Sequence, residues 1–276
     1  MVRRLLVLVA VAAAGCGHVP SGERSPGDRE GGAGGRSCFL LYEIGVGRLV
    51  RGPSEGCGVR VPPMSTFKVA HALAALDAGV LTGADEVIRY DGSVGAAESA
   101  RRDHTLATAM RHSVVWYFQR VAERLGEARE ADYLKRFEYG NADSSSHLTS
   151  FWLYESLLIS PEEQERFMVR LYEDALPVSH QAQAVVRDIL VEPPGSVVNA
   201  AGTHPFARPW PAGTVVSAKP GSSGPRAGSP DVRWLIGNVR RGGRSWIFVS
   251  DVVGADLPPL AAIDLAARSL KAAGVL

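Results

Sequence analysis

The sequence lacks the patterns that would connect it with metal ions, nucleotides or nucleic acids. It contains no His-Glu-x-x-His and no Cys-x-x-Cys, and no glycine-rich loop follows a strand-like run. Its 30 basic and 29 acidic residues are scattered, which leaves a net charge of +1 and no field to attract nucleic acid or acidic lipid. We therefore expect no metal cofactor, no nucleic-acid partner and no electrostatic attachment to a membrane.

Long apolar runs are also scarce, and the run Leu5 to Ala14 is shorter than the roughly 20 residues that span a bilayer. Two arginines precede it, and small residues separate it from Cys16, so residues 1–16 read as a secretory signal. The small residues directly before Cys16 resemble the lipobox of bacterial lipoproteins. This resemblance implies a lipid on Cys16 and export across the inner membrane to a lipid-anchored, periplasmic location. Ordinary secretion is the alternative, because Ala13 stands where such boxes more often have leucine.

Cysteine is rare, and removing Cys16 from the three leaves Cys38 and Cys57 as an even pair in an oxidising compartment. Cys38 opens a strand-like run, and Cys57 lies just beyond the returning run 48–51. A disulfide would therefore staple the first hairpin. Two buried free thiols are the alternative.

The rest of the chain is typical of a globular protein, since 46% of its 276 residues are hydrophobic. Residues 17–36 are rich in Gly, Pro, Ser and charge, which predicts a flexible linker before a domain at 37–276. Strand-like runs stand at both ends of that domain, and a helical lobe is expected at about 80–200. This order predicts an α+β fold in which one sheet is assembled from distant segments.

The only Ser-x-x-Lys of the sequence, Ser65 to Lys68, follows two prolines and precedes an apolar stripe of helical spacing. A serine and a lysine three residues apart share one helical face and can act as a nucleophile with its own base. At a helix start the Ser65 N–H has no intrahelical partner, so it can also help to bind an oxyanion. The apolar neighbours of Lys68 favour a lowered pKa.

Four further motifs follow in order along the chain: Ser113-Val114-Val115, Tyr139-Gly140-Asn141, Phe151-Trp152-Leu153 and Lys219-Pro220-Gly221. Together with the stretches 103–106 (DHTL) and 151–164 (FWLYESLLISPEEQ), they resemble the class D β-lactamases, serine enzymes of the penicillin-recognising group. The resemblance extends from about Cys38 to the last strand. It implies an antiparallel sheet flanked by helices, with an inserted, mostly helical lobe.

The resemblance implies that a β-lactam carbonyl acylates Ser65. Neutral Lys68 would react with CO₂ to form an N-carboxylated lysine, the general base of both acylation and deacylation. The indole N–H of Trp152 would hold this group. CO₂ or bicarbonate is therefore the only small molecule implied besides the substrate.

Other residues receive roles by the same resemblance. Ser113 would relay protons toward the leaving nitrogen, and Val115 would form an apolar wall beside the modified lysine. Lys219 would supply positive charge to the substrate carboxylate and to Ser113. The Ser222 N–H would complete an oxyanion hole with that of Ser65.

Two departures from the family pattern affect substrate binding. Pro220, beside Gly221 in the substrate-binding strand, replaces a threonine, which removes a hydroxyl and a backbone N–H; proline is tolerated on an edge strand. Leu260 stands near the place of an arginine for the substrate carboxylate, which would cost roughly tenfold to a hundredfold in recognition unless another cation substitutes. Arg226 and Arg233 are the candidates for this substitution.

The leading interpretation is hydrolysis of a small-molecule β-lactam. A penicillin-binding receptor or decoy that is acylated without turnover is the alternative, because of Pro220 and the missing arginine. A cell-wall peptidase on the same fold is a third interpretation, which Trp152 and the apolar setting of Lys68 disfavour. The sequence leaves a homodimer open.

Two further expectations concern residues outside the chemistry. Tyr139-Gly140-Asn141 is expected to be a structural loop, with Gly140 providing the turn and Asn141 its cap. His71, His104 and His112 are expected on helices as surface or cap residues.

Overall fold

The structure is a computed structural model that describes residues 35–52, 56–92, 97–224 and 228–276. The predicted signal sequence, Cys16 and nearly all of the predicted linker lie outside these residues. Within the described part of the chain, no helix combines the length and apolarity needed to cross a bilayer.

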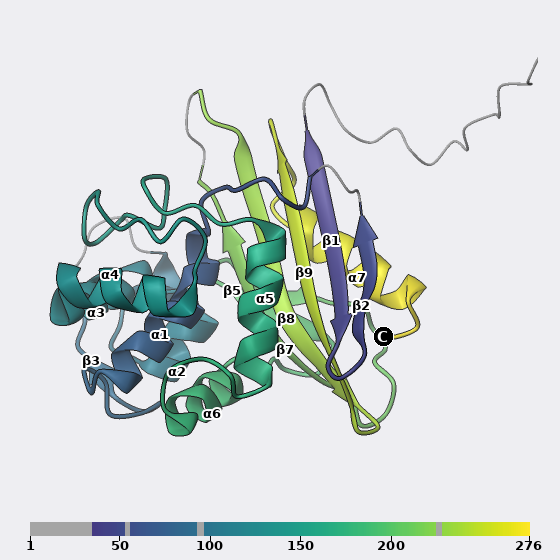
Figure 1. Cartoon of the computed structure of the whole chain (residues 1–276), viewed down its shortest axis with the longest axis horizontal. Helices are drawn as coiled ribbons and strands as arrows, with labels where there is room; N and C mark the ends of the chain where they lie inside the picture. The colour runs from purple at the N-terminus through teal and green to yellow at the C-terminus, as the bar shows by residue number, and fades with distance from the viewer. Residues whose placement is uncertain (1–34, 53–55, 93–96, 225–227) are drawn as a thin grey trace, which may run out of the picture. The chain divides into compact units, whose positions relative to one another are not determined.

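Strands from both ends of the described chain form one five-stranded antiparallel sheet (Figure 1). Its order is β2-β1-β9-β8-β7, and Gly242 and Gly243, both with positive φ, turn the chain between β8 and β9. The strands are β1 (Arg36–Glu43), β2 (Gly47–Gly52), β7 (Val215–Ser222), β8 (Asp231–Arg241) and β9 (Arg244–Gly254). The predicted α+β fold with a sheet built from distant segments is confirmed.

One helix covers each face of this sheet. Helix α5 (Pro161–Tyr172) packs on one face, and α7 (Ala261–Ala272) packs on the other. Along β8, Trp234 and Ile236 enter the core on the α5 side, whereas Leu235 and Val239 enter the core on the α7 side. This two-residue alternation is what a strand buried on both faces requires.

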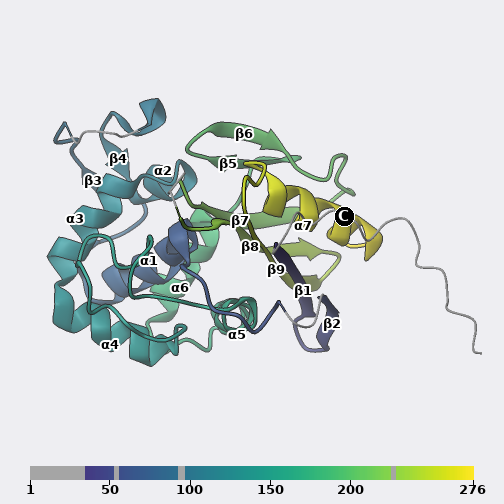
Figure 2. The same ribbon diagram turned by 90° about the horizontal axis from the view of Figure 1, so that it is seen from above.

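The remaining helices gather beyond the β7 edge of the sheet (Figure 2). They are α1 (Phe67–Asp77), α2 (Leu106–Arg111), α3 (Val115–Leu125), α4 (Glu127–Phe137) and α6 (His180–Ile189), with the short 3₁₀ turns Met64–Thr66 and Glu98–Ala100. Two small hairpins complete the fold: β3 (Val87–Ile88) with β4 (His104–Thr105), and β5 (Ser196–Asn199) with β6 (Gly202–Pro205), where β5 contacts β7. The sequence analysis predicted neither hairpin.

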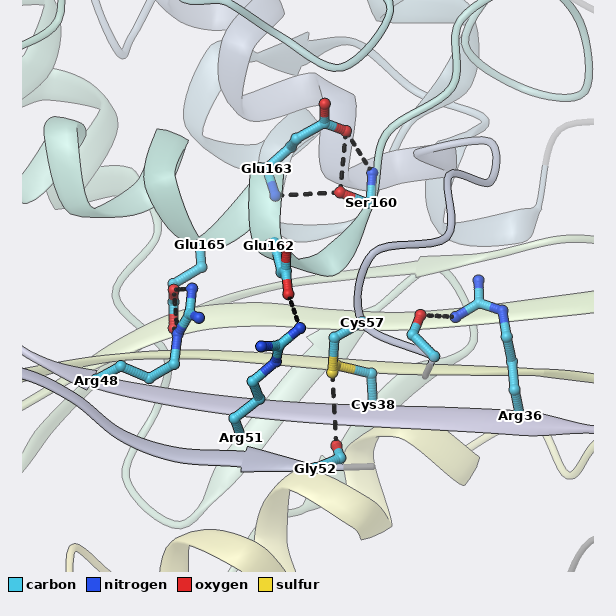
Figure 3. A network of polar contacts seen from close by, with 11 residues as sticks. Arg36, Cys38, Arg48, Arg51, Gly52, Cys57, Ser160, Glu162, Glu163 and Glu165 are labelled. Atoms are coloured by element: carbon cyan, nitrogen blue, oxygen red, sulfur yellow. Dashed lines mark hydrogen bonds and ion pairs between the residues drawn. A yellow bond between two sulfur atoms is a disulfide. The ribbon is translucent and has the colours of Figure 1, made fainter. Parts of the chain in front are cut away.

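The N-terminal hairpin is fastened to its surroundings by a disulfide and by ion pairs (Figure 3). Cys38 and Cys57 are joined by a disulfide with a Cα–Cα distance of 5.2 Å. Arg48 bonds Glu165 of α5 with an Nε–Oε2 distance of 2.8 Å, and Arg51 pairs with Glu162. These links anchor the hairpin at the start of the loop that leads to Ser65.

Candidate active site

Ser65 lies in the 3₁₀ turn Met64–Thr66 that precedes α1, as its spacing from the prolines predicted. Met64 has a φ of 53°, a left-handed conformation that costs a non-glycine residue about 1–2 kcal/mol. Surrounding bonds hold the turn: the Met64 N–H donates to the Trp152 carbonyl at 3.1 Å, and Gln164 Nε2 donates to Thr66 Oγ1 at 2.6 Å. The strained backbone is therefore fixed from two other segments of the chain.

The Lys68 side chain lies fully buried, one helical turn from the serine. Its Nζ donates to Ser65 Oγ at 2.8 Å and lies 5.5 Å from the centroid of the Phe118 ring. Burial lowers the pKa of Lys68 well below its ordinary value, and the positive charge of Lys219 lowers it further. A neutral amine in this position can accept the proton of the Ser65 hydroxyl.

Trp152 is completely buried beside the first turn of α1. Its ring centroid lies 5.7 Å from that of Phe67, which precedes Lys68, and 5.4 Å from that of His71, which lies three residues after Lys68 in α1. Within the described residues, its Nε1–H has no hydrogen-bond acceptor. A buried, unpaired donor costs about 1–3 kcal/mol, so an added acceptor on Lys68 would fit this site.

Ser113 and Lys219 form the second polar pair of the site. Ser113 lies in the turn between α2 and α3 with a φ of 56°, and Lys219 Nζ donates to its Oγ at 3.0 Å. Lys219 also donates to the Pro220 carbonyl at 3.0 Å and is 1% exposed. Burial lowers the pKa of Lys219 to about 7, although the carboxylate of Glu192 opposes the shift.

The register of β7 decides which backbone groups face the nucleophile. The Ser223 N–H donates to Val232 on the β8 side, whereas the Ala218 N–H donates outward to Leu190. Because the direction alternates along a strand, the Ser222 N–H also points outward, and so would an N–H at Pro220. A Cβ at Gly221 would lie 3.2 Å from the Thr66 N, so this edge of β7 passes close beside the Ser65 turn.

Proline at 220 therefore breaks no hydrogen bond between β7 and β8, because it occupies an outward-facing position of an edge strand. The same geometry places the Ser222 N–H on the side of the strand where an oxyanion hole would need it. Val115 is the first residue of α3, two positions after Ser113, and is 37% exposed. Its role as an apolar wall stays a prediction.

The two candidate replacements for the carboxylate-binding arginine differ. Arg226 lies outside the described residues. Arg233 is buried on β8, where its guanidinium donates to Ser223 and to the Leu257 carbonyl and pairs with Asp231 at 3.3 Å. Leu260 precedes α7 as its N-cap residue. Arg233 is thus already engaged by protein groups.

The expectation for the histidines was wrong in two cases. His71 is fully buried, and its Nε2 lies 2.6 Å from Glu130 Oε1 of α4. His104 is 1% exposed and lies in β4, where its ring contacts Ser99 and Thr108. Both histidines are buried by tertiary contacts, which helical periodicity alone does not reveal.

The Tyr139-Gly140-Asn141 segment is a structural loop, as expected. A Cβ at Gly140 would lie 2.0 Å from the Leu158 carbonyl oxygen, and Asn141 bonds the backbone of Ser156 and Leu158. The Tyr139 hydroxyl accepts from Gln164 Nε2 at 3.2 Å. This loop thereby supports the Ser65 turn through Gln164.

Sequence reasoning missed Gln164 and Glu192 as residues of the site. Gln164 closes the matched stretch 151–164, which was a usable signal, whereas Glu192 stands in a proline-rich segment without a motif. In the described part of the chain, no group of three or more His, Cys, Asp or Glu side chains is arranged to hold a metal ion.

The geometry defines a serine acyl-transfer site between a helical lobe and the edge of a sheet. A family model of the penicillin binding protein transpeptidase domain matches residues 54–271. The chain is also 33% identical over 214 residues to the probable beta-lactamase YbxI of Bacillus subtilis, a match that covers 78% of this chain and 73% of the relative. It is 34% identical over 196 residues to beta-lactamase OXA-48 of Klebsiella pneumoniae, covering 71% of this chain and 66% of the relative.

Solved structures agree with these relatives. The class D beta-lactamase BAT-2 matches with a TM-score of 0.75 and 30% identity over 88% of this chain and 93% of its own. The class D YbXI beta-lactamase from Nostoc matches with a TM-score of 0.77 and 25% identity over 88% of this chain and 95% of its own. The chain belongs to the class D serine β-lactamases, as the sequence motifs indicated.

Proposed function

We propose that the protein hydrolyses β-lactam antibiotics through an acyl-enzyme on Ser65, with an N-carboxylated Lys68 as general base. The observation that carries the proposal is the combination of a fully buried Lys68 bonded to Ser65 and an unpartnered indole N–H at Trp152. Burial lowers the pKa of Lys68 well below its ordinary value and so favours the neutral amine, the only form that reacts with CO₂.

The residues of the chain divide the work of this reaction. Lys68 accepts the Ser65 proton while the oxygen attacks the β-lactam carbonyl, and the outward N–H groups of Ser65 and Ser222 bind the oxyanion. Ser113, bonded to Lys219, delivers a proton to the leaving nitrogen as the amide bond of the ring breaks. When present, the carboxylate on Lys68 supplies the base for both steps, for the Ser65 proton in acylation and for the hydrolytic water in deacylation, and the Trp152 N–H orients it.

The proposal is tested with the purified mature protein, a chromogenic cephalosporin and several penicillins, with and without bicarbonate. Turnover that increases with bicarbonate supports it. Absence of turnover under both conditions would contradict it, and carbon-13 NMR with labelled bicarbonate checks the carbamate directly.

A receptor or decoy that is acylated without turnover is the second candidate. Pro220 lacks the hydroxyl of the family's threonine, and Arg233 is already bonded to Asp231 and Ser223. Both features would weaken binding of the substrate carboxylate. Intact-mass spectrometry separates the two functions: adducts that persist indicate a receptor, whereas adducts that form and disappear indicate an enzyme.

We also propose that Cys16 is the lipid-bearing first residue of a periplasmic protein. The support is the sequence pattern before Cys16. Changing Cys16→Ser should release the protein into the soluble fraction. A wild-type protein that is already soluble and cleaved elsewhere would contradict the lipid anchor.

A further inference from the structure

Glu192 is a buried carboxylate held against the strand that carries Lys219. The segment 190–192 runs along the outer edge of β7: the Ala218 N–H donates to the Leu190 carbonyl, and the Glu192 N–H donates to the Val216 carbonyl, both at 2.9 Å. Glu192 is 7% exposed, and its Oε2 accepts from the Val198 N–H at 3.1 Å. Backbone and side chain therefore fix this carboxylate in one place.

The carboxylate shares a pocket with the active-site lysine. Glu192, Lys219, Pro220 and Arg111 line the same pocket beside β7. Within the described residues, no carboxylate lies at ion-pair distance from Lys219 Nζ, so the charge of Glu192 acts on it across the pocket. The other charged groups that face this centre are Lys68 from α1 and Arg111 from α2.

We propose that Glu192 is a positioning residue that keeps Lys219 protonated, so that Lys219 remains the donor to Ser113 and its positive charge keeps Lys68 neutral. The inference rests on the proposed acylation of Ser65 and adds a residue to it. The negative charge of Glu192 stabilises the protonated form of Lys219, and the positive charge of Lys219 disfavours protonation of Lys68.

The directions of the pKa shifts agree with these effects. Glu192 raises the pKa of Lys219 against the larger effect of burial, and Lys219 lowers that of Lys68 in addition to burial. Burial raises the pKa of Glu192 itself to about 7, while Lys219, the Val198 N–H and Arg111 oppose that rise. Loss of the Glu192 charge should therefore lower the pKa of Lys219 and should not lower that of Lys68.

The chain offers a direct measurement because it contains four lysines: Lys68, Lys135, Lys219 and Lys271. Lys135 and Lys271 are exposed, so replacing both by arginine leaves two lysine signals from the site. Carbon-13 labelling at lysine Cε then follows each site lysine through a pH titration without bicarbonate. Lys219→Arg assigns the two signals.

In Glu192→Gln, the amide oxygen can still accept from Val198, but the charge is gone. We expect the Lys219 midpoint to fall by about one pH unit, the size of one charge acting across a pocket, and the Lys68 midpoint to stay or rise. In the pH–rate profile for acylation of Ser65 by a fluorescent penicillin, the apparent pKa of the basic limb should fall by the same amount. Glu192→Asp, which retains the charge, should restore most of both shifts.

Glu165→Gln is the matched control, because Glu165 is an equally buried carboxylate that pairs with Arg48 away from the site. It should leave both lysine midpoints unchanged. Unchanged midpoints in Glu192→Gln, or shifts of both lysines in the same direction, would overturn the inference. If Glu192→Gln does not fold, Glu192→Asp provides the test. The shorter aspartate places its charge farther from Lys219, so the Lys219 midpoint should fall by a smaller amount than is expected for Glu192→Gln.

Failure of the proposed function and failure of the role of Glu192 give different results. A wild-type protein that fluorescent penicillin does not acylate would contradict the proposed function, whereas the lysine titration would still test the role of Glu192. Acylation of the wild type combined with an unmoved Lys219 midpoint would contradict the role of Glu192 alone.

Discussion

Between the N-terminal hairpin and α5, two partly exposed arginines, Arg48 and Arg51, pair with the glutamates of α5, whereas around Ser65 two lysines are buried with no described carboxylate at ion-pair distance. The side chains of Arg48 and Arg51 are 32% and 45% exposed, and Lys68 and Lys219 are 0% and 1% exposed. The hydrogen bond to Glu165 raises the pKa of Arg48, whereas burial lowers that of each lysine. The ion pair thus favours the charged form of Arg48, whereas burial disfavours the charged form of both lysines.

This difference separates structural from chemical use of charge. Ion pairs with an exposed member contribute about 0–1 kcal/mol each. A buried lysine without a carboxylate partner lowers stability, but burial shifts its pKa toward neutrality, where proton transfer is useful.

Lys68→Ala should have the largest effect, because it removes the proposed general base. Loss of a positioned general base lowers the rate by about 10²–10⁴-fold, and deacylation should suffer more than acylation. Steady-state hydrolysis and intact-mass spectrometry of the Ser65 adduct measure the two steps. Lys135→Ala, an exposed lysine, serves as the control. Undiminished turnover in Lys68→Ala would remove Lys68 from the mechanism.

Trp152→Phe should raise the bicarbonate concentration needed for half-maximal activity by roughly tenfold to a hundredfold. A hydrogen bond to a charged group contributes about 1.5–3 kcal/mol, and phenylalanine retains the packing but not the donor. Activity is measured over a bicarbonate series. The same change at Trp246, which is buried on the α7 side of the sheet, should not alter the requirement. Identical bicarbonate curves for Trp152→Phe and wild type would contradict this role.

Asp251 is a buried carboxyl group that pairs with Arg36 of the N-terminal hairpin and lies away from Ser65. Its carboxylate lies 2.7 Å from Arg36, yet burial raises its pKa to about 7. Between its ordinary value of 3.8 and about 7, the folded protein holds a proton that the unfolded chain releases. The free energy of unfolding should therefore fall as pH rises through this window.

Asp251→Asn should remove that fall, so the difference in unfolding free energy between pH 5 and pH 7.5 should shrink by about 1–3 kcal/mol. Denaturant unfolding at the two pH values measures the change. If the variant and the wild type lose the same stability over this range, Asp251 is ionised throughout and this prediction is wrong.

Arg51→Ala should have the smallest effect. Its partner Glu162 is partly exposed, and such pairs contribute about 0.2–1 kcal/mol. Denaturant unfolding in low and high salt measures it, and the difference should disappear in high salt. A loss above about 2 kcal/mol would show that the hairpin network acts as a unit and not as separate pairs.

The sequence predicted those features that depend on neighbours along the chain. The spacing of Ser65 and Lys68, the apolar stripe of α1 and the two glycines between β8 and β9 each define local geometry. The order of the motifs then located Ser113 and Lys219, although their 3.0 Å contact joins residues 106 positions apart.

Features that depend on tertiary contacts were missed. His71 was expected at the surface because nothing near it in sequence indicates that Glu130 of α4 covers it. The β5–β6 hairpin was missed because its strands are short and lie in a segment rich in glycine and proline. Arg233 could be named as a candidate cation, but only the structure shows that Asp231 and Ser223 already hold it.

The pairing of β1 with β9 has a consequence for how the protein is made. Arg36 lies opposite Val253, so the sheet closes a loop of more than 200 residues, and such non-local pairing slows folding. The Ser65 turn also rests on β7, which leaves the ribosome long after the serine. A nascent chain that ends after α6 contains the nucleophile and Lys68 but no strand edge beside them. The arrangement of Ser65, Ser113 and Lys219 therefore forms only once the C-terminal strands have been synthesised.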